Sequence, residues 1–185
     1  LKLDLPRCVE QISSALRRQI LTELKRKGGV VGLSGGIDSS VVAELSVRAL
    51  GKERVLGLLM PERESSEDSL ALGRLVADHL GIPTLVEDIT PALQAVGCYR
   101  KRDEMIQSVV PNYESGCKCK IVLPDLSGSA YRIFSVVVEF PDGTQVRARL
   151  TPEAYLGIVA ATNFKQRVRK MIEYYHADRM NYAVM

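Results

Sequence analysis

The sequence predicts an α/β protein in which a parallel β-sheet is flanked by helices. Three short apolar runs, at residues 30–33, 54–60 and 84–89, have the length and composition of buried strands. Amphipathic segments separate these runs, which gives the order strand, helix, strand, helix, strand. Such an alternation forms a parallel sheet covered by helices, because parallel strands need a crossover connection. A glycine loop after the first strand would then lie at the carboxyl end of the sheet, where open α/β sheets bind ligands.

The spacing of apolar residues predicts the helices. The first helix, over residues 6–27, follows Asp4 and Pro6, which suit a helix start, and it has an apolar face. The residues on this face are Val9, Ile12, Leu16, Ile20 and Leu24. Two further helices, over residues 38–50 and 66–80, are each closed by a glycine. Each connection between the predicted strands therefore contains one helix.

The pattern changes over residues 98–150 and becomes helical again afterwards. Two β-rich runs flank Pro141-Asp142-Gly143 and predict a hairpin. Residues 164–180 predict an amphipathic helix, and residues 181–185 have the composition of another buried strand. The apolar stripe of this helix consists of Phe164, Val168, Met171, Ile172 and Tyr175. We expect residues 1–97 and 151–185 to form one α/β domain, and residues 98–150 to be an insertion into it.

Composition excludes several classes of protein. Hydrophobic residues make up 46% and charged residues 25%, as in ordinary globular domains, and no apolar run approaches a membrane span. A net charge of +3 is too small to indicate a nucleic-acid partner. The four cysteines, Cys8, Cys98, Cys117 and Cys119, are too scattered for a disulfide framework, so we expect a cytoplasmic protein. Metal binding at Cys117 and Cys119 would need two further ligands, so we expect two thiols on an irregular segment there.

The most informative motif is SGGIDS, residues 34–39, between a predicted strand and a predicted helix. Glycine lets the backbone approach phosphate oxygens, and the helix N-terminus supplies unpaired N–H donors. Ser34 and Ser39 can add hydroxyl groups, and Asp38 is compatible with bound phosphate if it holds a Mg²⁺ ion that bridges to the phosphates. The lysine of a Walker A loop and the GxGxxG fingerprint are both absent. The motif therefore predicts a phosphate-binding loop of another kind.

The stretch GLSGGIDSS resembles the PP-loop of the N-type ATP pyrophosphatases, which cleave ATP between the α- and β-phosphates. Residues 55–70 and 161–185 are similar to segments of one family within them, the ammonia-dependent NAD synthetases. The resemblance covers about half of the chain. It implies a Rossmann-like fold of the adenine nucleotide alpha hydrolase type, with residues 1–97 and 151–185 as the PP-loop domain. In the family, a segment with further ATP and metal ligands follows the strand at 181–185, so residues 1–185 are expected to hold an incomplete site.

The resemblance also implies a set of site residues. The expected ATP ligands are Gly32, Ser34, Gly35, Gly36, Ile37, Asp38 and Ser39 around the phosphates, with Leu58 and Met60 near the adenine. Asp38 and Ser34 would be catalytic, with Asp38 as the Mg²⁺ ligand. Arg167 would contact deamido-NAD, because a guanidinium can pair with phosphate or carboxylate through two hydrogen bonds.

The implied activity is that of a ligase that forms a C–N bond in NAD biosynthesis. ATP would adenylate the carboxylate of deamido-NAD, and ammonia would then displace AMP to give NAD. No glutaminase cysteine is visible, so free ammonia is the expected nitrogen source, and a homodimer is expected from the family. Two alternatives remain open at this point. One is a PP-loop sulfur transferase or thiolase that acts on RNA or a cofactor through Cys117 or Cys119, and the other is a non-catalytic module that binds adenine nucleotides.

Overall fold

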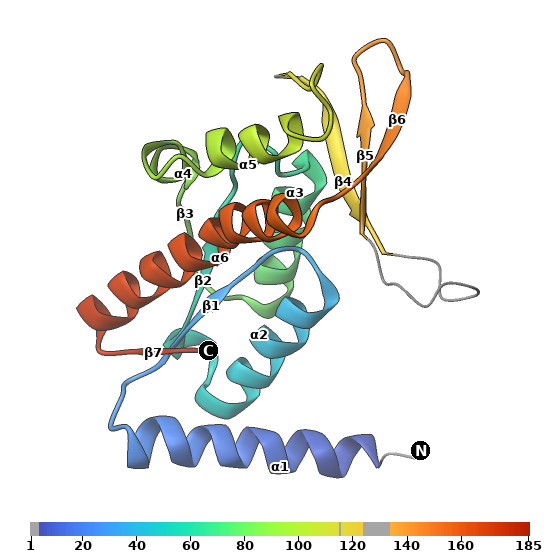
Figure 1. Cartoon of the computed structure of the whole chain (residues 1–185). Helices are drawn as coiled ribbons and strands as arrows, with labels where there is room; N and C mark the ends of the chain where they lie inside the picture. The colour runs from blue at the N-terminus through green and yellow to red at the C-terminus, as the bar shows by residue number, and fades with distance from the viewer. Residues whose placement is uncertain (1–3, 115, 124–133) are drawn as a thin grey trace. The chain divides into compact units, whose positions relative to one another are not determined.

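The computed structural model describes residues 4–114, 116–123 and 134–185. They form two compact units, one of Leu1–Pro91 with Arg167–Met185 and one of Ala92–Gln166 (Figure 1). The first unit contains a four-stranded sheet in the order β3-β2-β1-β7, in which every neighbouring pair is parallel. Its strands are β1 (Gly29–Gly32), β2 (Val55–Leu59), β3 (Thr84–Val86) and β7 (Ala183–Val184). This confirms the predicted α/β fold with a parallel sheet.

The helices of the first unit begin and end close to the predicted positions. They are α1 (Leu5–Arg17) with a π-helical turn, η1 (Arg18–Glu23), then α2 (Ile37–Leu50), the short 3₁₀ helix η2 (Lys52–Arg54), α3 (Glu67–Leu80) and the second half of α6 (Pro152–Met180). Asp4 caps α1 by accepting a hydrogen bond from the Arg7 N–H at 3.2 Å. Ser66 caps α3 in the same way through the Ser69 N–H at 3.3 Å. Such caps satisfy N–H groups that the helix itself leaves unpaired.

The central strands β1 and β2 bury side chains on both faces of the sheet. The strands β3 and β7 lie at its edges and are only partly buried, so the prediction of buried strands at 84–89 and 181–185 is wrong in this respect. Val31 and Val55 point to one face and join a hydrophobic core that α2 and α3 complete. The opposite face of β1 carries Gly32, where a Cβ atom would lie 2.7 Å from the Glu173 carboxylate of α6. The second half of α6 therefore covers the face of the sheet opposite to α2 and α3.

The apolar stripe predicted on α6 is wrong in part. Met171 and Tyr175 are 58% and 62% exposed, whereas Glu173 and His176 are 4% and 3% exposed. Burial of polar groups is tolerated where hydrogen bonds replace those to water. Both buried side chains have such partners, so the buried face of the helix is set by polar pairing as well as by apolar spacing.

His176 links α6 to the segment that follows β3. The Arg179 Nε donates to His176 Nδ1 at 3.1 Å, which makes that ring nitrogen the acceptor. His176 Nε2 therefore carries the proton of the neutral ring and donates it to Glu87 Oε1 at 2.8 Å. The ring thus ties Glu87, next after β3, to the helix that covers the sheet.

Replacing His176 by alanine is expected to lower the free energy of unfolding by about 2 kcal/mol or more, because the buried ring fills space and satisfies two partners. Urea denaturation of the two proteins measures the difference. The matched control is His79→Ala, which removes an exposed histidine from the last turn of α3 and should cost less than about 0.5 kcal/mol. Equal losses in the two variants would contradict the structural role of the His176 pair.

The second unit contains a three-stranded antiparallel sheet in the order β4-β5-β6. Its elements are α4 (Thr90–Ala95, which begins in the first unit), α5 (Cys98–Gln107), β4 (Lys118–Val122), β5 (Ser135–Glu139), β6 (Gln145–Arg149) and the first half of α6. The predicted hairpin is confirmed as β5–β6, with Gly143 at a φ of 84° in the turn. Residues 131–133 of its first expected run lie outside the described residues. Packing of the sheet against Ile106 and Ile158 gives the unit a core of its own.

The predicted insertion, residues 98–150, lies inside this unit. The sequence did not predict α5, because most of its residues are polar and only Cys98, Tyr99 and Ile106 are buried. A hairpin alone is marginal in water, whereas a third strand and an apolar core provide stability. The division into a PP-loop domain and an insertion stays a prediction.

Candidate functional site

The predicted phosphate loop connects β1 to α2 at the carboxyl end of a central strand, with β2 on one side of β1 and β7 on the other. Helix α2 begins at Ile37, one residue earlier than predicted, and Gly36 is its N-cap. No side chain caps this helix, in contrast to α1 and α3. The N–H groups of its first turn are thus available to an anion, and the helix dipole favours negative charge there.

The structure brings the two predicted serines together. The Ser34 and Ser39 Oγ atoms lie 3.1 Å apart, and Ser39 Oγ also donates to the Gly36 carbonyl at 3.0 Å. The Ser34 N–H in turn donates to Ser39 Oγ at 3.3 Å. These contacts hold the loop in one conformation, with Ser34 exposed and Ser39 half-buried, so its backbone needs little reorganisation before an anion binds.

Gly35 and Gly36 differ in what a side chain at each position would contact. Gly35 has a φ of 76°, and a Cβ atom there would lie 2.8 Å from both the Leu72 Cβ and the Ser69 carbonyl of α3. Gly36 has ordinary backbone angles, and its Cβ would meet only Ser34 Oγ, at 3.3 Å. Gly35 is therefore required by the fold, whereas a side chain added at Gly36 would meet only the Ser34 hydroxyl group.

Asp38 lies in the first turn of α2 with an exposed side chain. Among the described residues, no three His, Cys, Asp or Glu side chains gather as a metal site. Mg²⁺ in nucleotide sites is held by one or two carboxylates, with phosphate and water oxygens completing its sphere. A single exposed carboxylate beside a phosphate loop fits that ligand set.

The remaining predicted ligands lie on β2 and α6. Leu58 is fully buried, and Met60, directly after β2, is 8% exposed. The strand register places Leu58 opposite Gly32, the last residue of β1, so Leu58 and Met60 both lie near the carboxyl end of the sheet. Arg167 is exposed on α6, one turn before Lys170. Ligand contacts of these residues stay predictions.

Sequence reasoning missed the pair of Lys170 and Glu173. Lys170 Nζ donates to the Glu173 carboxylate at 2.5 Å, and this carboxylate lies beside Gly32 at the end of β1. Helical spacing gave no signal for this pair, because Glu173 lies about 140° around the helix from Val168 and about 100° from Ile172. The predicted apolar stripe therefore did not include the face on which Glu173 is buried.

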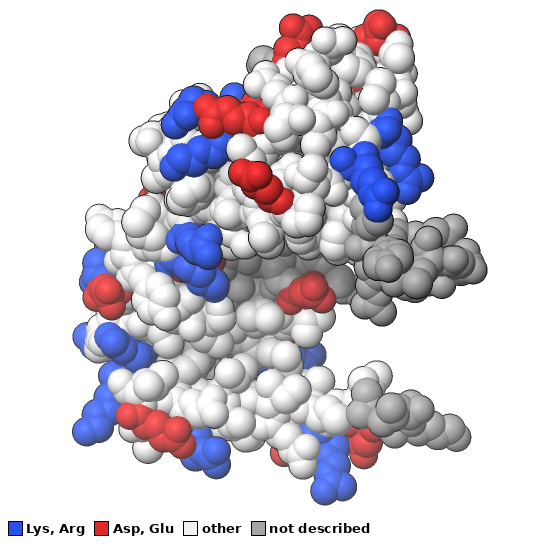
Figure 2. All heavy atoms as spheres, viewed as in Figure 1, with Lys and Arg blue, Asp and Glu red and all other residues white. Residues whose placement is uncertain are grey.

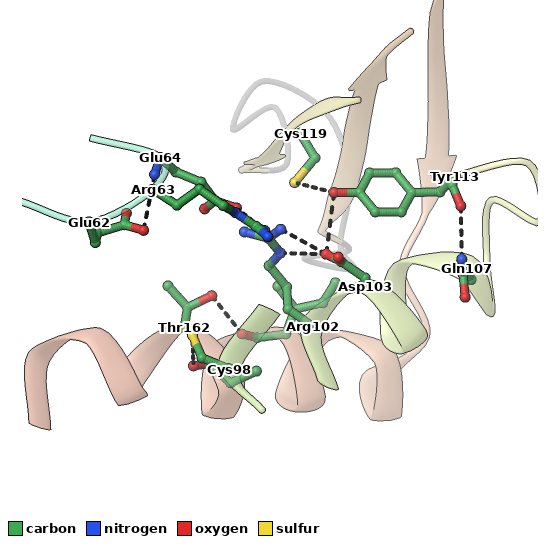
Figure 3. Close-up of polar contacts among 12 residues, drawn as sticks. Glu62, Arg63, Glu64, Cys98, Arg102, Asp103, Gln107, Tyr113, Cys119 and Thr162 are labelled. Atoms are coloured by element: carbon green, nitrogen blue, oxygen red, sulfur yellow. Dashed lines mark hydrogen bonds and ion pairs between the residues drawn. The ribbon is translucent and has the colours of Figure 1, made fainter. Parts of the chain in front are cut away.

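Polar contacts in the second unit surround Tyr113 (Figure 3). Its hydroxyl lies 3.4 Å from Asp103 Oδ1, which Arg102 also contacts, and 3.8 Å from the Cys119 thiol. Burial raises the pKa of Tyr113 above its usual range, and the neighbouring Cys119 raises it further, so the phenol stays protonated. Cys117 and Cys119 both pack against the core of this unit. Cys119 lies in β4, so the expectation of an irregular segment is wrong for this residue.

One face of the β4-β5-β6 sheet is basic, and Lys and Arg side chains gather there in Figure 2. The strand register places Lys120 and Arg147 on either side of Val137. Glu139 lies on the same face, and hydrogen bonds from Gln145 and Lys118 lower the pKa of its carboxyl group.

Within the described ranges, no helix combines the length and the apolar character that crossing a membrane requires.

Comparison with known proteins finds relatives over the whole of this chain. The NAD synthase family model matches residues 8–121. An NH(3)-dependent NAD(+) synthetase of Mesorhizobium japonicum is 58% identical over 185 residues, which are 100% of this chain and 58% of that protein. The corresponding protein of Rhizobium meliloti is 53% identical over 186 residues, 100% of this chain and 55% of that protein. The chain thus spans a little over half the length of these relatives.

Solved structures of lower identity share the fold. An NH3-dependent NAD synthetase from Campylobacter jejuni has a TM-score of 0.61 at 22% identity, over 98% of this chain and 56% of that one. An NAD+ synthetase from Burkholderia pseudomallei has a TM-score of 0.59 at 19% identity, over 99% of this chain and 62% of that one. The fold, the loop sequence and the matched range agree with one another, and they show that the chain belongs to the NAD synthase family.

Proposed function

We propose that this chain forms the ATP-binding part of an ammonia-dependent NAD synthetase, which amidates deamido-NAD. The observation that carries the proposal is the glycine loop before the uncapped N-terminus of α2, in a chain that is 58% identical to an NH(3)-dependent NAD(+) synthetase. Such a terminus offers several N–H donors to an anion at one point. The function that fits it is cleavage of ATP with release of an anionic product.

The proposed reaction has two steps. A carboxylate oxygen of deamido-NAD attacks the α-phosphorus of ATP, and the bond from that phosphorus to the pyrophosphate oxygen breaks. Ammonia then attacks the carboxyl carbon of the adenylate, the bond from this carbon to the AMP oxygen breaks, and the nitrogen loses a proton. Adenylation is needed because a free carboxylate has no good leaving group. The products are NAD, AMP and pyrophosphate.

The loop residues would act on the first step. The N–H groups at the start of α2 and the hydroxyls of Ser34 and Ser39 would bind the phosphates and stabilise the charge that develops on the departing pyrophosphate. Asp38 would hold Mg²⁺, which when bound neutralises phosphate charge. The backbone of the loop is already ordered by its hydrogen bonds and needs little rearrangement during the reaction. The Ser39 hydroxyl would turn from the Gly36 carbonyl to donate to a phosphate oxygen.

Other features of the protein belong to the same proposal. Leu58 and Met60 would lie near the adenine, and Arg167 would bind deamido-NAD. A homodimer, a cytoplasmic location, free ammonia as the nitrogen donor, and the absence of nucleic-acid and membrane partners stay predictions. The family match does not favour sulfur transfer, which would also need a reactive thiol at Cys117 or Cys119.

The first test uses the full-length gene product with ATP, Mg²⁺, deamido-NAD and ammonium, with products separated by mass. NAD and AMP are expected in equal amounts.

Arg167→Ala is expected to raise KM for deamido-NAD about tenfold or more, because it removes a charge-assisted contact, and to change KM for ATP less. Arg7→Ala, at an exposed position of α1, is the control. ATP cleavage without NAD would discard the proposed acceptor.

A further inference from the structure

The buried acid Glu173 lies at the end of the strand that leads into the phosphate loop. Its side chain is 5% exposed. A carboxylate loses much of its hydration on burial, and a buried charge therefore requires a partner. Glu173 therefore needs specific polar partners at this position.

One carboxylate oxygen of Glu173 faces β1. Glu173 Oε1 would lie 2.7 Å from a Cβ atom on Gly32, and Met60 Cε would lie 3.2 Å from the same point. The absence of a side chain at Gly32 therefore makes room for the carboxylate. Ser34 follows two residues later, about 7 Å along an extended chain. The carboxylate is thus next to the base of the loop.

The other carboxylate oxygen binds Lys170. Lys170 Nζ donates to Glu173 Oε2 and lies 3.5 Å from the Met185 carbonyl, which directly follows β7. The Lys170 side chain is 54% exposed, in contrast to its partner. The pair therefore has a buried negative end and an exposed positive end, which is fixed between the carboxyl ends of β1 and β7.

We infer that Lys170 binds a phosphate group of ATP, and that Glu173 is the positioning residue that holds its ammonium group beside the loop. The inference rests on the proposed function, because it presumes ATP at this loop. Residues 34–39 contain no cation, and Asp38 adds a negative charge to a ligand that is already strongly anionic. An ammonium group has three donors, so Lys170 can keep its bond to Glu173 while it binds a phosphate oxygen.

A merely structural ion pair would behave differently from a ligand-binding one. Replacement of both partners of a buried pair by neutral groups of similar shape is often tolerated, whereas loss of one partner leaves a buried charge unpaired. The double variant Lys170→Met with Glu173→Gln keeps the shape and removes both charges. It is therefore expected to fold, and it separates phosphate binding from stability.

The experiment measures binding of the magnesium complex of α,β-methylene ATP to the full-length protein by calorimetry, together with thermal unfolding. The double variant is expected to bind at least about tenfold more weakly than the wild type, with Tm little changed, because a charge-assisted contact is lost. Lys170→Arg is expected to retain most of the affinity. Lys170→Met alone should also lower Tm, since Glu173 then lacks its partner.

Lys52→Met is the matched control. It removes the same charge from η2, which precedes β2 and lies at the opposite end of the strands. Its affinity for the ATP analogue should equal that of the wild type. Wild-type affinity in a folded double variant would overturn the inference and leave the proposed function intact. A wild-type protein that does not bind the analogue would overturn the proposed function itself.

Discussion

Asp38→Ala is expected to abolish AMP formation without loss of the fold. The side chain is exposed in the first turn of α2 and packs against no core, so its removal should leave Tm almost unchanged. The carboxylate is the proposed ligand of the metal that neutralises phosphate charge. Loss of such electrostatic stabilisation lowers kcat by about 100-fold or more.

The measurement is AMP release at saturating ATP and a range of Mg²⁺ concentrations. Asp78→Ala, which removes an exposed carboxylate from α3, is the control and should retain full activity. Asp38→Glu keeps the charge and is expected to recover part of the rate at high Mg²⁺. Near-normal turnover in the alanine variant would rule out Asp38 as the metal ligand.

Alanine substitution at the two central glycines of the loop is expected to affect different properties: ATP affinity at Gly36 and stability at Gly35. Gly36→Ala should fold like the wild type, because its Cβ would meet only the Ser34 Oγ, at 3.3 Å, and this exposed side chain can turn away. The added methyl group would occupy the space where phosphate oxygens approach the backbone. Affinity for ATP is therefore expected to fall about tenfold or more, with little change in Tm.

Gly35→Ala should instead destabilise the protein. The positive φ and the contacts at 2.8 Å with α3 force the backbone to move, at a cost of about 1–3 kcal/mol. Thermal unfolding and calorimetric titration with ATP, performed on both variants, distinguish the two effects. A Gly36→Ala protein with wild-type affinity would mean that phosphate does not approach the backbone at this residue.

Local signals were enough to predict the first unit. Apolar runs such as residues 54–60 became strands because few side chains in them could be left in water. Glycines ended helices where a positive φ was needed, as at Gly81 with a φ of 64°. The turn between β1 and α2 was predicted from residue types alone, since a strand, two glycines and a helix start are all local. Phosphate binding at this turn stays a prediction.

The sequence did not predict contacts between distant residues. Burial of Glu173 depends on the space above Gly32, and burial of His176 depends on Glu87. Neither partner lies within the window over which helical spacing is measured. The strand β4 was missed for the same reason, because its alternation is weak and its stability comes from pairing with β5.

Because β1 pairs with β7, this part of the sheet can form only late during translation. Gly29 lies opposite Ala183, so the strand that leads into the phosphate loop acquires its second neighbour only after more than 150 further residues have left the ribosome. Contacts so distant in sequence form late in folding. Until then β1 has an open edge, which can pair with other chains. The nascent protein is therefore expected to need protection from aggregation until β7 has been synthesised.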